Sequence, residues 1–159
     1  DEINQFSQKM NSTYVSYNHF GSDRMDNQIE QDQNALKMGV SNGSLRAKAK
    51  ISANYSNSSW DLIDAYLADS MVVYKMKKDD LPTELRGKTA EELQEIVDQK
   101  LTERNEIKLK ISELSVKREA FIKRKKEETN VDETDDFGSA INQSILNKAI
   151  DLGFDKPMQ

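Results

Sequence analysis

The sequence predicts an all-α fold: an elongated helical bundle or hairpin that contains one long, coiled-coil-like helix and a short extended segment near the N-terminus. Two observations favour this fold. Residues 89–128 contain neither proline nor glycine, and many of their apolar residues recur at alternating steps of four and three, as in a heptad repeat. The chain is 36% hydrophobic and 32% charged, a composition that suits exposed helices better than a compact sphere.

Residues 1–88 are predicted to hold short helices and a connector. The first helix has apolar residues at helical spacing, and an extended segment rich in β-branched and aromatic residues follows it. A second, polar helix is predicted from Ser22, as its N-cap, to a stop at Gly39. The apolar positions on these two helices are Ile3, Phe6 and Met10, then Met25, Ile29 and Leu36.

A turn is predicted at the stretch "SNGS", residues 41–44, and a helix at Leu45–Tyr55. A β-strand is the alternative for Leu45–Tyr55, because the apolar residues there also alternate with the period of a strand. Alanine and lysine favour the helix. The next stretch, "SSWDLIDAYLADSMVVY", predicts one helix with Ser58 or Ser59 as its cap. Its apolar stripe comprises Trp60, Ile63, Leu67 and Met71.

The long helix is the most informative predicted element. Thr89 and Glu92 form a capping box at its start, after a connector that contains Pro82 and Gly87. About 40 residues at about 1.5 Å each give about 60 Å of helix, too long for a compact domain with a radius of gyration near 15 Å. We therefore expect the helix to project or the molecule to be elongated. The apolar positions of its seam are Leu93, Val97, Ile107, Ile111, Leu114 and Phe121, and the polar ones are Lys100, Arg104 and Arg118.

The remainder of the chain is predicted to form a mobile acidic loop at 129–136 and a last helix at 137–153. The whole chain, residues 1–159, is then a single helical domain, with the long helix at 89–128. It begins at Asp1 with neither an initiator methionine nor a signal peptide, which suggests an excised or processed product.

Composition excludes several classes of function. The formal net charge of −5 argues against a nucleic-acid-binding protein, which usually carries a basic field. The absence of cysteine excludes disulfides and thiolate metal sites. No apolar run approaches the roughly 18 residues of a membrane-spanning helix. We therefore expect neither a nucleic-acid partner nor a transmembrane segment.

The strongest candidates for chemistry are Asp61 and Asp64, which stand three residues apart at the start of a predicted helix. Such a pair can share a cation or divide acid and base roles. The favoured interpretation is structural, because negative charge in a first turn is stabilised by the helix dipole. His19 is the only histidine, and without a partner histidine the serines have no general base. We expect no catalytic residue, no metal ligand and no cofactor.

Four stretches together resemble a known family. They are "TYVSY" at Thr13–Tyr17, "WDLIDA" at Trp60–Ala65, "DLPTELRG" at Asp80–Gly87 and "ERNEIKLKISELSVKR" at Glu103–Arg118. In this order they resemble the segment that follows the von Willebrand factor A domain in exported bacterial proteins. The chain departs from that pattern at Lys88, where a methionine is usual. It also lacks the D-x-S-x-S sequence of that domain's metal site, so no metal binding is carried over.

The resemblance implies an accessory C-terminal region in the periplasm or cell envelope. It also implies a protein partner, such as an upstream von Willebrand factor A-like domain. We expect a non-catalytic structural or protein-interaction module. In it, Trp60, Ile63 and Leu67 would anchor the short helices on a seam that comprises Leu93, Val97, Ile107 and Leu114. A third hypothesis is homo-oligomerisation through the long helix. The alternative is a cation-dependent binding or hydrolytic site at Asp61 and Asp64.

Overall fold

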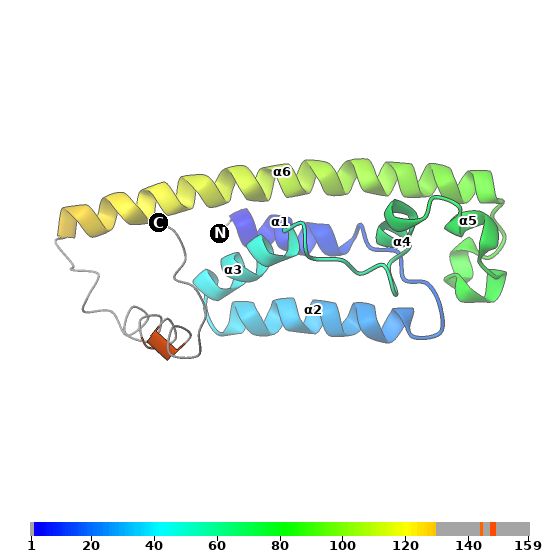
Figure 1. Ribbon diagram of the computed structural model, residues 1–159, viewed down its shortest axis with the longest axis horizontal. Coiled ribbons are helices and arrows are strands. Elements are labelled where there is room, and N and C mark those ends of the chain that lie inside the picture. Colours follow the sequence, from blue (N-terminus) through cyan, green and yellow to red (C-terminus); the bar gives the residue numbers. More distant parts are fainter. Residues whose placement is uncertain (1, 130–143, 145–146, 149–159) are drawn as a thin grey trace. The chain divides into compact units, whose positions relative to one another are not determined.

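The computed structural model describes residues 2–129 together with residues 144, 147 and 148. The all-α prediction is confirmed, because the described residues form six α-helices and two short 3-10 helices and no β-strand (Figure 1). The helices are α1 (Glu2–Asn11), α2 (Gly21–Lys37), α3 (Val40–Lys50), α4 (Leu62–Ala68), α5 (Val72–Lys75) and α6 (Ala90–Thr129). The 3-10 helices η1 (Lys78–Asp80) and η2 (Thr83–Leu85) lie in the connector before α6.

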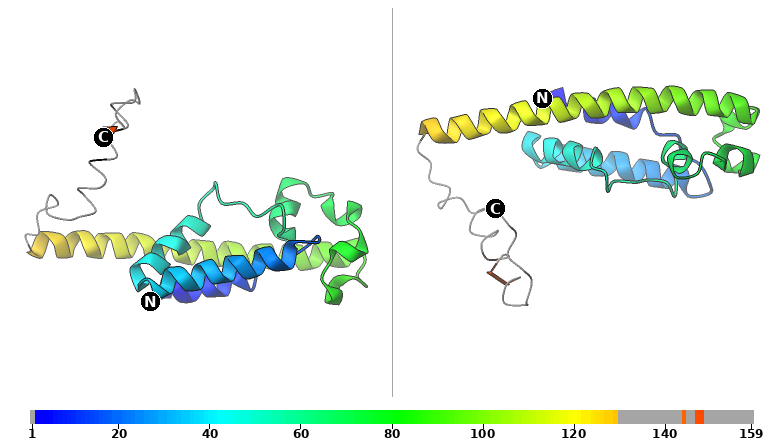
Figure 2. Two further views of the ribbon diagram at one scale, coloured as in Figure 1. Left: turned by 90° about the horizontal axis from the view of Figure 1, so that it is seen from below. Right: turned by 45° about the horizontal axis from the view of Figure 1, so that its top comes forward.

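The chain divides into two compact units, Asp1–Lys117 and Arg118–Gln159. In the first unit α1, α2 and α3 contact one another. Figure 1 shows α1 between α6 and α2, and residues of both α1 and α3 pack against Ile107 and Ile111 of α6. The right view of Figure 2 shows the same arrangement of these helices. The second unit includes the end of α6 from Arg118. The loop was predicted at 129–136, but Thr129 belongs to α6, and 130–136 lie outside the described residues. Most of the predicted helix at 137–153 also lies outside them, and of it Ser144, Asn147 and Lys148 are helical.

The predicted extended segment follows α1 and is fastened to the start of α4. Ser16 and Asp61 form an isolated antiparallel bridge. On either side of it the Tyr17 N–H donates to the carbonyl of Trp60 at 2.8 Å, and the Leu62 N–H donates to the carbonyl of Val15 at 2.8 Å. These bonds satisfy backbone groups that would otherwise be buried without partners, and they bring Trp60 and Asp61 against the chain that leaves α1.

Two predictions about α2 and α3 are wrong. Ser22 is not the N-cap, because α2 already begins at Gly21, after a turn in which Asn18 has a φ of 63° and accepts a hydrogen bond from the Phe20 N–H. Residues 41–44 are not a turn but the beginning of α3. Met38 and Gly39 separate the two helices, and Gly39 has a φ of 139° that L side chains rarely adopt.

The single helix predicted from Ser58 to Tyr74 is also wrong. Asp61 is the N-cap of α4, and its side chain accepts from the Asp64 N–H. Trp60 therefore precedes the helix, and the chain breaks again between α4 and α5. The predicted stripe fails at its end, since Leu67 is 58% exposed and Met71 is 50% exposed. The buried side of α4 is formed by Leu62, Ile63 and Ala65.

The long helix was predicted correctly. The Thr89 N–H donates to Glu92 Oε2 at 2.8 Å, and the Glu92 N–H donates to Thr89 Oγ1 at 3.2 Å, which is the expected capping box. The seam is buried over most of its length in the first unit, although Leu114 is only half-buried. Phe121, in the second unit, is 52% exposed.

Two apolar clusters share this seam. The first cluster joins α1 and Trp60 to the middle of α6, and the second joins α4, α5 and the connector to its beginning. Between them on α6 stands Arg104, which is 1% exposed. The buried members of the first cluster are Ile3, Met10, Tyr14, Ala47, Trp60, Ile107 and Ile111. Those of the second are Val15, Leu62, Ile63, Val73, Leu81, Leu93 and Val97.

Candidate functional site

Arg104 binds both aspartates that the sequence singles out. Its Nη1 lies 2.6 Å from Asp61 Oδ2 and 2.9 Å from Asp64 Oδ1. Its other nitrogens reach the segment after α1, where Nε donates to Thr13 Oγ1 at 2.9 Å and Nη2 donates to the Thr13 carbonyl at 2.7 Å. We refer to Thr13, Asp61, Asp64 and Arg104 as the Arg104 cluster. It ties α6, the start of α4 and the extended segment together.

Each carboxylate of this cluster also accepts from the backbone. Asp61 Oδ1 accepts from the Val15 N–H at 2.9 Å, and Asp64 Oδ2 accepts from the Asn57 N–H at 2.7 Å. Asp61 is fully buried. Burial raises the pKa of its carboxyl group, while hydrogen bonding and charge from Arg104 act in the opposite direction.

The Tyr14 ring covers the guanidinium of Arg104, and Trp60 packs on that ring. The Tyr14 ring centroid lies 4.5 Å from Arg104 Cζ, and the Trp60 ring is 5.3 Å from the Tyr14 ring. A cation over an aromatic face is attracted by the ring quadrupole, most strongly when water is excluded. Burial also raises the pKa of the Tyr14 hydroxyl. Arg104, Asp61 and Thr13 are closed off from solvent, and the guanidinium occupies the position between the two carboxylates that a shared cation would take.

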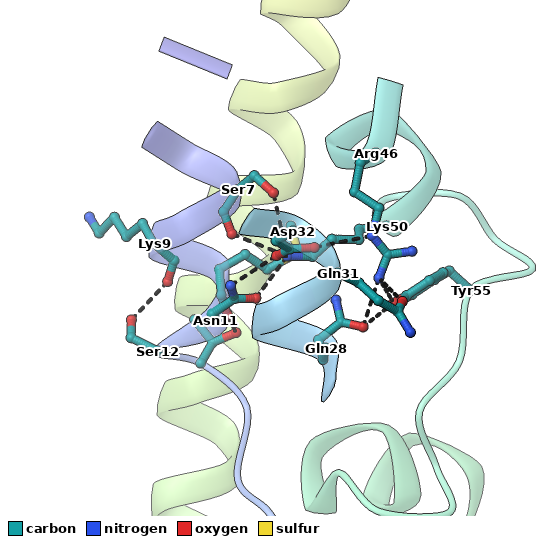
Figure 3. A network of polar contacts seen from close by, with 12 residues as sticks. Ser7, Lys9, Asn11, Ser12, Gln28, Gln31, Asp32, Arg46, Lys50 and Tyr55 are labelled. Carbon is teal, nitrogen blue, oxygen red and sulfur yellow. Dashed lines mark hydrogen bonds and ion pairs between the residues drawn. The ribbon is translucent and has the colours of Figure 1, made fainter. Parts of the chain in front are cut away.

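A second buried polar group, which we call the Lys50 network, fastens α1, α2 and α3 to one another (Figure 3). Lys50 Nζ lies 2.5 Å from Asp32 Oδ2 and donates to Asn11 Oδ1 at 2.8 Å and to the Ser7 carbonyl at 3.2 Å. Desolvation lowers the pKa of Lys50, and the neighbouring Asp32 carboxylate opposes this shift. With the Ser7 hydroxyl at 3.4 Å, four acceptors surround this ammonium group, and Lys50 is only 1% exposed.

Arg46 extends this network toward the outside. It donates from Nε to Asp32 Oδ1 at 3.1 Å and from Nη2 to Gln28, Gln31 and Tyr55, each at 2.9 Å. The Tyr55 hydroxyl donates to the same Gln28 oxygen. Sequence reasoning missed the Lys50 network. Lysines and arginines in an alanine-rich helix are typical of a solvated face, so no local signal marks Lys50 as buried.

Most of the residues predicted as structural anchors lie in the first apolar cluster, the second apolar cluster or the Arg104 cluster. Trp60 lies in the first apolar cluster with Ile107, and the half-buried Leu114 packs against it. Leu93 and Val97 lie in the second cluster with Ile63. Asp61 and Asp64 lie in the Arg104 cluster. The exposed Leu67 contributes to neither apolar cluster, so its predicted anchoring role is wrong.

Two classes of site find no support in the part of the chain that the structure describes. It contains no group of three or more histidine or acidic side chains placed to hold a metal ion, and His19 lies exposed in the turn before α2. Among the described helices, none is both long enough and apolar enough to cross a membrane.

No protein-family model, curated protein or solved structure matches this chain. The resemblance to the segment after a von Willebrand factor A domain therefore stays a prediction that rests on the four sequence stretches alone.

Proposed function

We propose that the chain is a non-catalytic structural or protein-interaction module. The observation that carries this proposal is the Arg104 cluster. Both acids that could have formed an active site are bound to one buried guanidinium and to backbone N–H groups. Groups held in this way fix the positions of α4 and α6, and they are withheld from substrate.

The partner surface that we propose is the solvent face of α6. Leu109 is 60% exposed and Val116 is 63% exposed, and their spacing of seven residues places them on one face of the helix. The charges are also distributed unevenly along α6. Residues 90–106 hold six acidic and two basic side chains, whereas residues 107–128 hold four acidic and eight basic ones. Two copies of α6 in antiparallel orientation would place opposite charges side by side, so we propose a second copy of the chain as partner.

Light scattering at increasing protein concentration tests this partner. We expect the unmodified chain to self-associate and the double variant Leu109→Glu, Val116→Glu to remain a monomer. The double variant Gln5→Glu, Gln8→Glu is the matched control, because it adds the same two charges at exposed positions of α1, outside α6. Strictly monomeric behaviour of the unmodified chain at high concentration would contradict self-association through α6.

We further propose, on the resemblance alone, that the chain is the accessory C-terminal region of an exported von Willebrand factor A-like protein of the periplasm or cell envelope. Its partner would then include the upstream domain of the same protein. The gene sequence that encodes the residues before Asp1 tests this proposal. A signal peptide followed by a D-x-S-x-S domain is the expected result, and an upstream region with neither would rule it out.

A further inference from the structure

The solvent face of α6 carries a row of exposed residues that are spaced seven apart, so they lie on nearly the same side of the helix. The other helices of the first unit lie on one side of α6 (Figure 1), where Val97 and Ile107 are buried. Each of these two is five residues from Thr102 and so lies about 140° from it around the helix. A second copy of the chain can therefore contact the row without meeting those helices. The five residues of the row, all of them exposed, are Glu95, Thr102, Leu109, Val116 and Lys123.

Two blocks of opposite charge lie at equal distances from Leu109 on either side. The acidic block, residues 91–98, holds four acidic side chains and no basic one. The basic block, residues 120–127, holds four basic side chains and one acidic one. Both blocks belong to the same continuous helix. A parallel, in-register pair of helices would bring like blocks together, whereas an antiparallel pair centred on Leu109 places each acidic block beside a basic one.

The row is complementary to itself in the same antiparallel arrangement. When the pair is centred on Leu109, each Glu95 lies opposite Lys123 of the second copy. Each Thr102 then lies opposite Val116, and Leu109 meets the same residue of the other copy. The apolar contact is thus at the centre and the opposite charges are at the two ends, so the apolar and the charged side chains favour the same register.

A shift of one helix along the other removes this agreement. If Leu109 lay opposite Val116 instead, Asp98 would lie opposite Glu127 of the second copy. Both acids are exposed and lie on the face of the row, and like charges placed opposite one another disfavour pairing. The register centred on Leu109 avoids this conflict, because it places the uncharged Ala120 opposite Asp98.

We propose that two copies of the chain pair through α6 with two-fold symmetry, with Leu109 on the axis and a Glu95–Lys123 ion pair at each end. Such a contact is isologous, because both copies contribute the same residues. The inference rests on the proposed self-association, and it adds the register and the residues that make a second copy the preferred partner. Exposed charges are screened by salt, so the pairing weakens as ionic strength rises.

Disulfide cross-linking tests the register directly. The chain has no cysteine, so a single introduced cysteine pairs only with its counterpart in another copy. We expect Leu109→Cys to give a covalent dimer on mild oxidation. Val116→Cys is the matched control, because the two copies of Val116 lie about 21 Å apart in this register, too far for a disulfide. A self-associating chain in which Leu109→Cys gives no more covalent dimer than Val116→Cys would overturn the register.

Charge reversal tests the ion pairs, with analytical ultracentrifugation at low ionic strength to measure the dissociation constant of the dimer. We expect Glu95→Lys and Lys123→Glu each to raise this constant about tenfold, since each places like charges opposite one another twice per dimer. The double variant restores opposite charges and should return the constant to within about threefold of the unmodified value. Glu30→Lys is the matched control, because it makes the same reversal at an exposed position of α2, and it should leave the constant unchanged.

The outcomes distinguish the register from the proposed self-association. A strictly monomeric unmodified chain would contradict both. A chain that self-associates, but whose double variant dissociates as readily as the single variants, would overturn the register alone.

Discussion

At the scale of single residues, Arg104 holds three segments of the chain together. It lies on the α6 seam at a position where a heptad repeat calls for an apolar side chain, and its burial costs solvation free energy. Four hydrogen bonds to Thr13, Asp61 and Asp64 offset that cost. Because those partners come from two other segments of the chain, the polar interruption specifies which segments pack against α6.

We predict that Arg104→Met strongly destabilises the first unit. The substitution leaves Asp61 and Asp64 without their cation, and breaking a buried ion pair in this way costs about 3–5 kcal/mol. Urea unfolding followed by Trp60 fluorescence measures the change. Lys108→Met is the control, because Lys108 is a half-buried basic residue of the same helix and its loss should cost less than about 0.5 kcal/mol. Equal midpoints for the two variants would show that the Arg104 cluster contributes no net stability.

The residues of this cluster also mark how far sequence reasoning reaches. Asp61 and Asp64 could be singled out because two acids at a helix start form a local pattern. Their partner Arg104 lies 40 or more residues further along the chain, and nothing in the local pattern links it to them. Trp60 was recognised as a core residue but placed inside the helix, because an aspartate and a serine are equally good N-caps.

At the scale of elements, helix boundaries decide which predictions fail. The stretch "SNGS" has the composition of a turn, yet it lies in the first turn of α3, after Val40. Its glycine, Gly43, is needed for close packing and not for reversal of the chain. A β-carbon at Gly43 would lie 2.4 Å from Asn4 Oδ1, and the Asn4 amide is held by a hydrogen bond to the Val40 carbonyl at 3.2 Å. Close approach of another helix cannot be inferred from the sequence of one helix alone.

Gly43→Ala should therefore destabilise the contact between α1 and α3. Overpacking typically costs about 1–3 kcal/mol, and the better helix propensity of alanine returns about 1 kcal/mol. Thermal unfolding measures the balance, which we expect to be a modest net loss. In an Asn4→Ala background the steric conflict is absent, and there the same substitution should be neutral or stabilising. A loss of the same size in both backgrounds would place the conflict somewhere other than Asn4.

The start of α6 makes a prediction about pH. The Thr89 N–H and the Lys88 ammonium hold the pKa of Glu92 below its ordinary value. Between the folded and the unfolded pKa the unfolded chain binds more protons, so stability rises with pH there and is lost as pH falls through the folded pKa. At neutral pH we expect Glu92→Gln to melt at a lower temperature than the unmodified protein. On acidification below about pH 4, past the ordinary pKa of a glutamate in the unfolded chain, the difference should shrink. A difference that stays constant with pH would show that the carboxylate charge plays no part in the cap.

At the scale of the whole molecule, the two apolar clusters lie on one continuous helix. The length of α6 and its seam could be predicted because a heptad repeat and a capping box are local in sequence. The division of the segments that pack on α6 into a first and a second cluster could not be predicted, because it depends on where α4 ends and on how the connector returns to α6.

Because both apolar clusters pack on the same α6 seam, a substitution that destabilises one cluster should also destabilise the other. We predict that Leu93→Ala, in the second cluster, lowers the unfolding midpoint reported by Trp60 in the first cluster. Leu93 is 3% exposed, and truncating such a leucine costs about 2–5 kcal/mol. Leu109→Ala is the matched control, since it makes the same change in the same helix at a residue that is 60% exposed. Measured in dilute solution, it should shift the midpoint little. A normal Trp60 transition in Leu93→Ala would mean that the two clusters unfold independently, with α6 fraying at its N-terminus while the Arg104 cluster and the first apolar cluster stay intact.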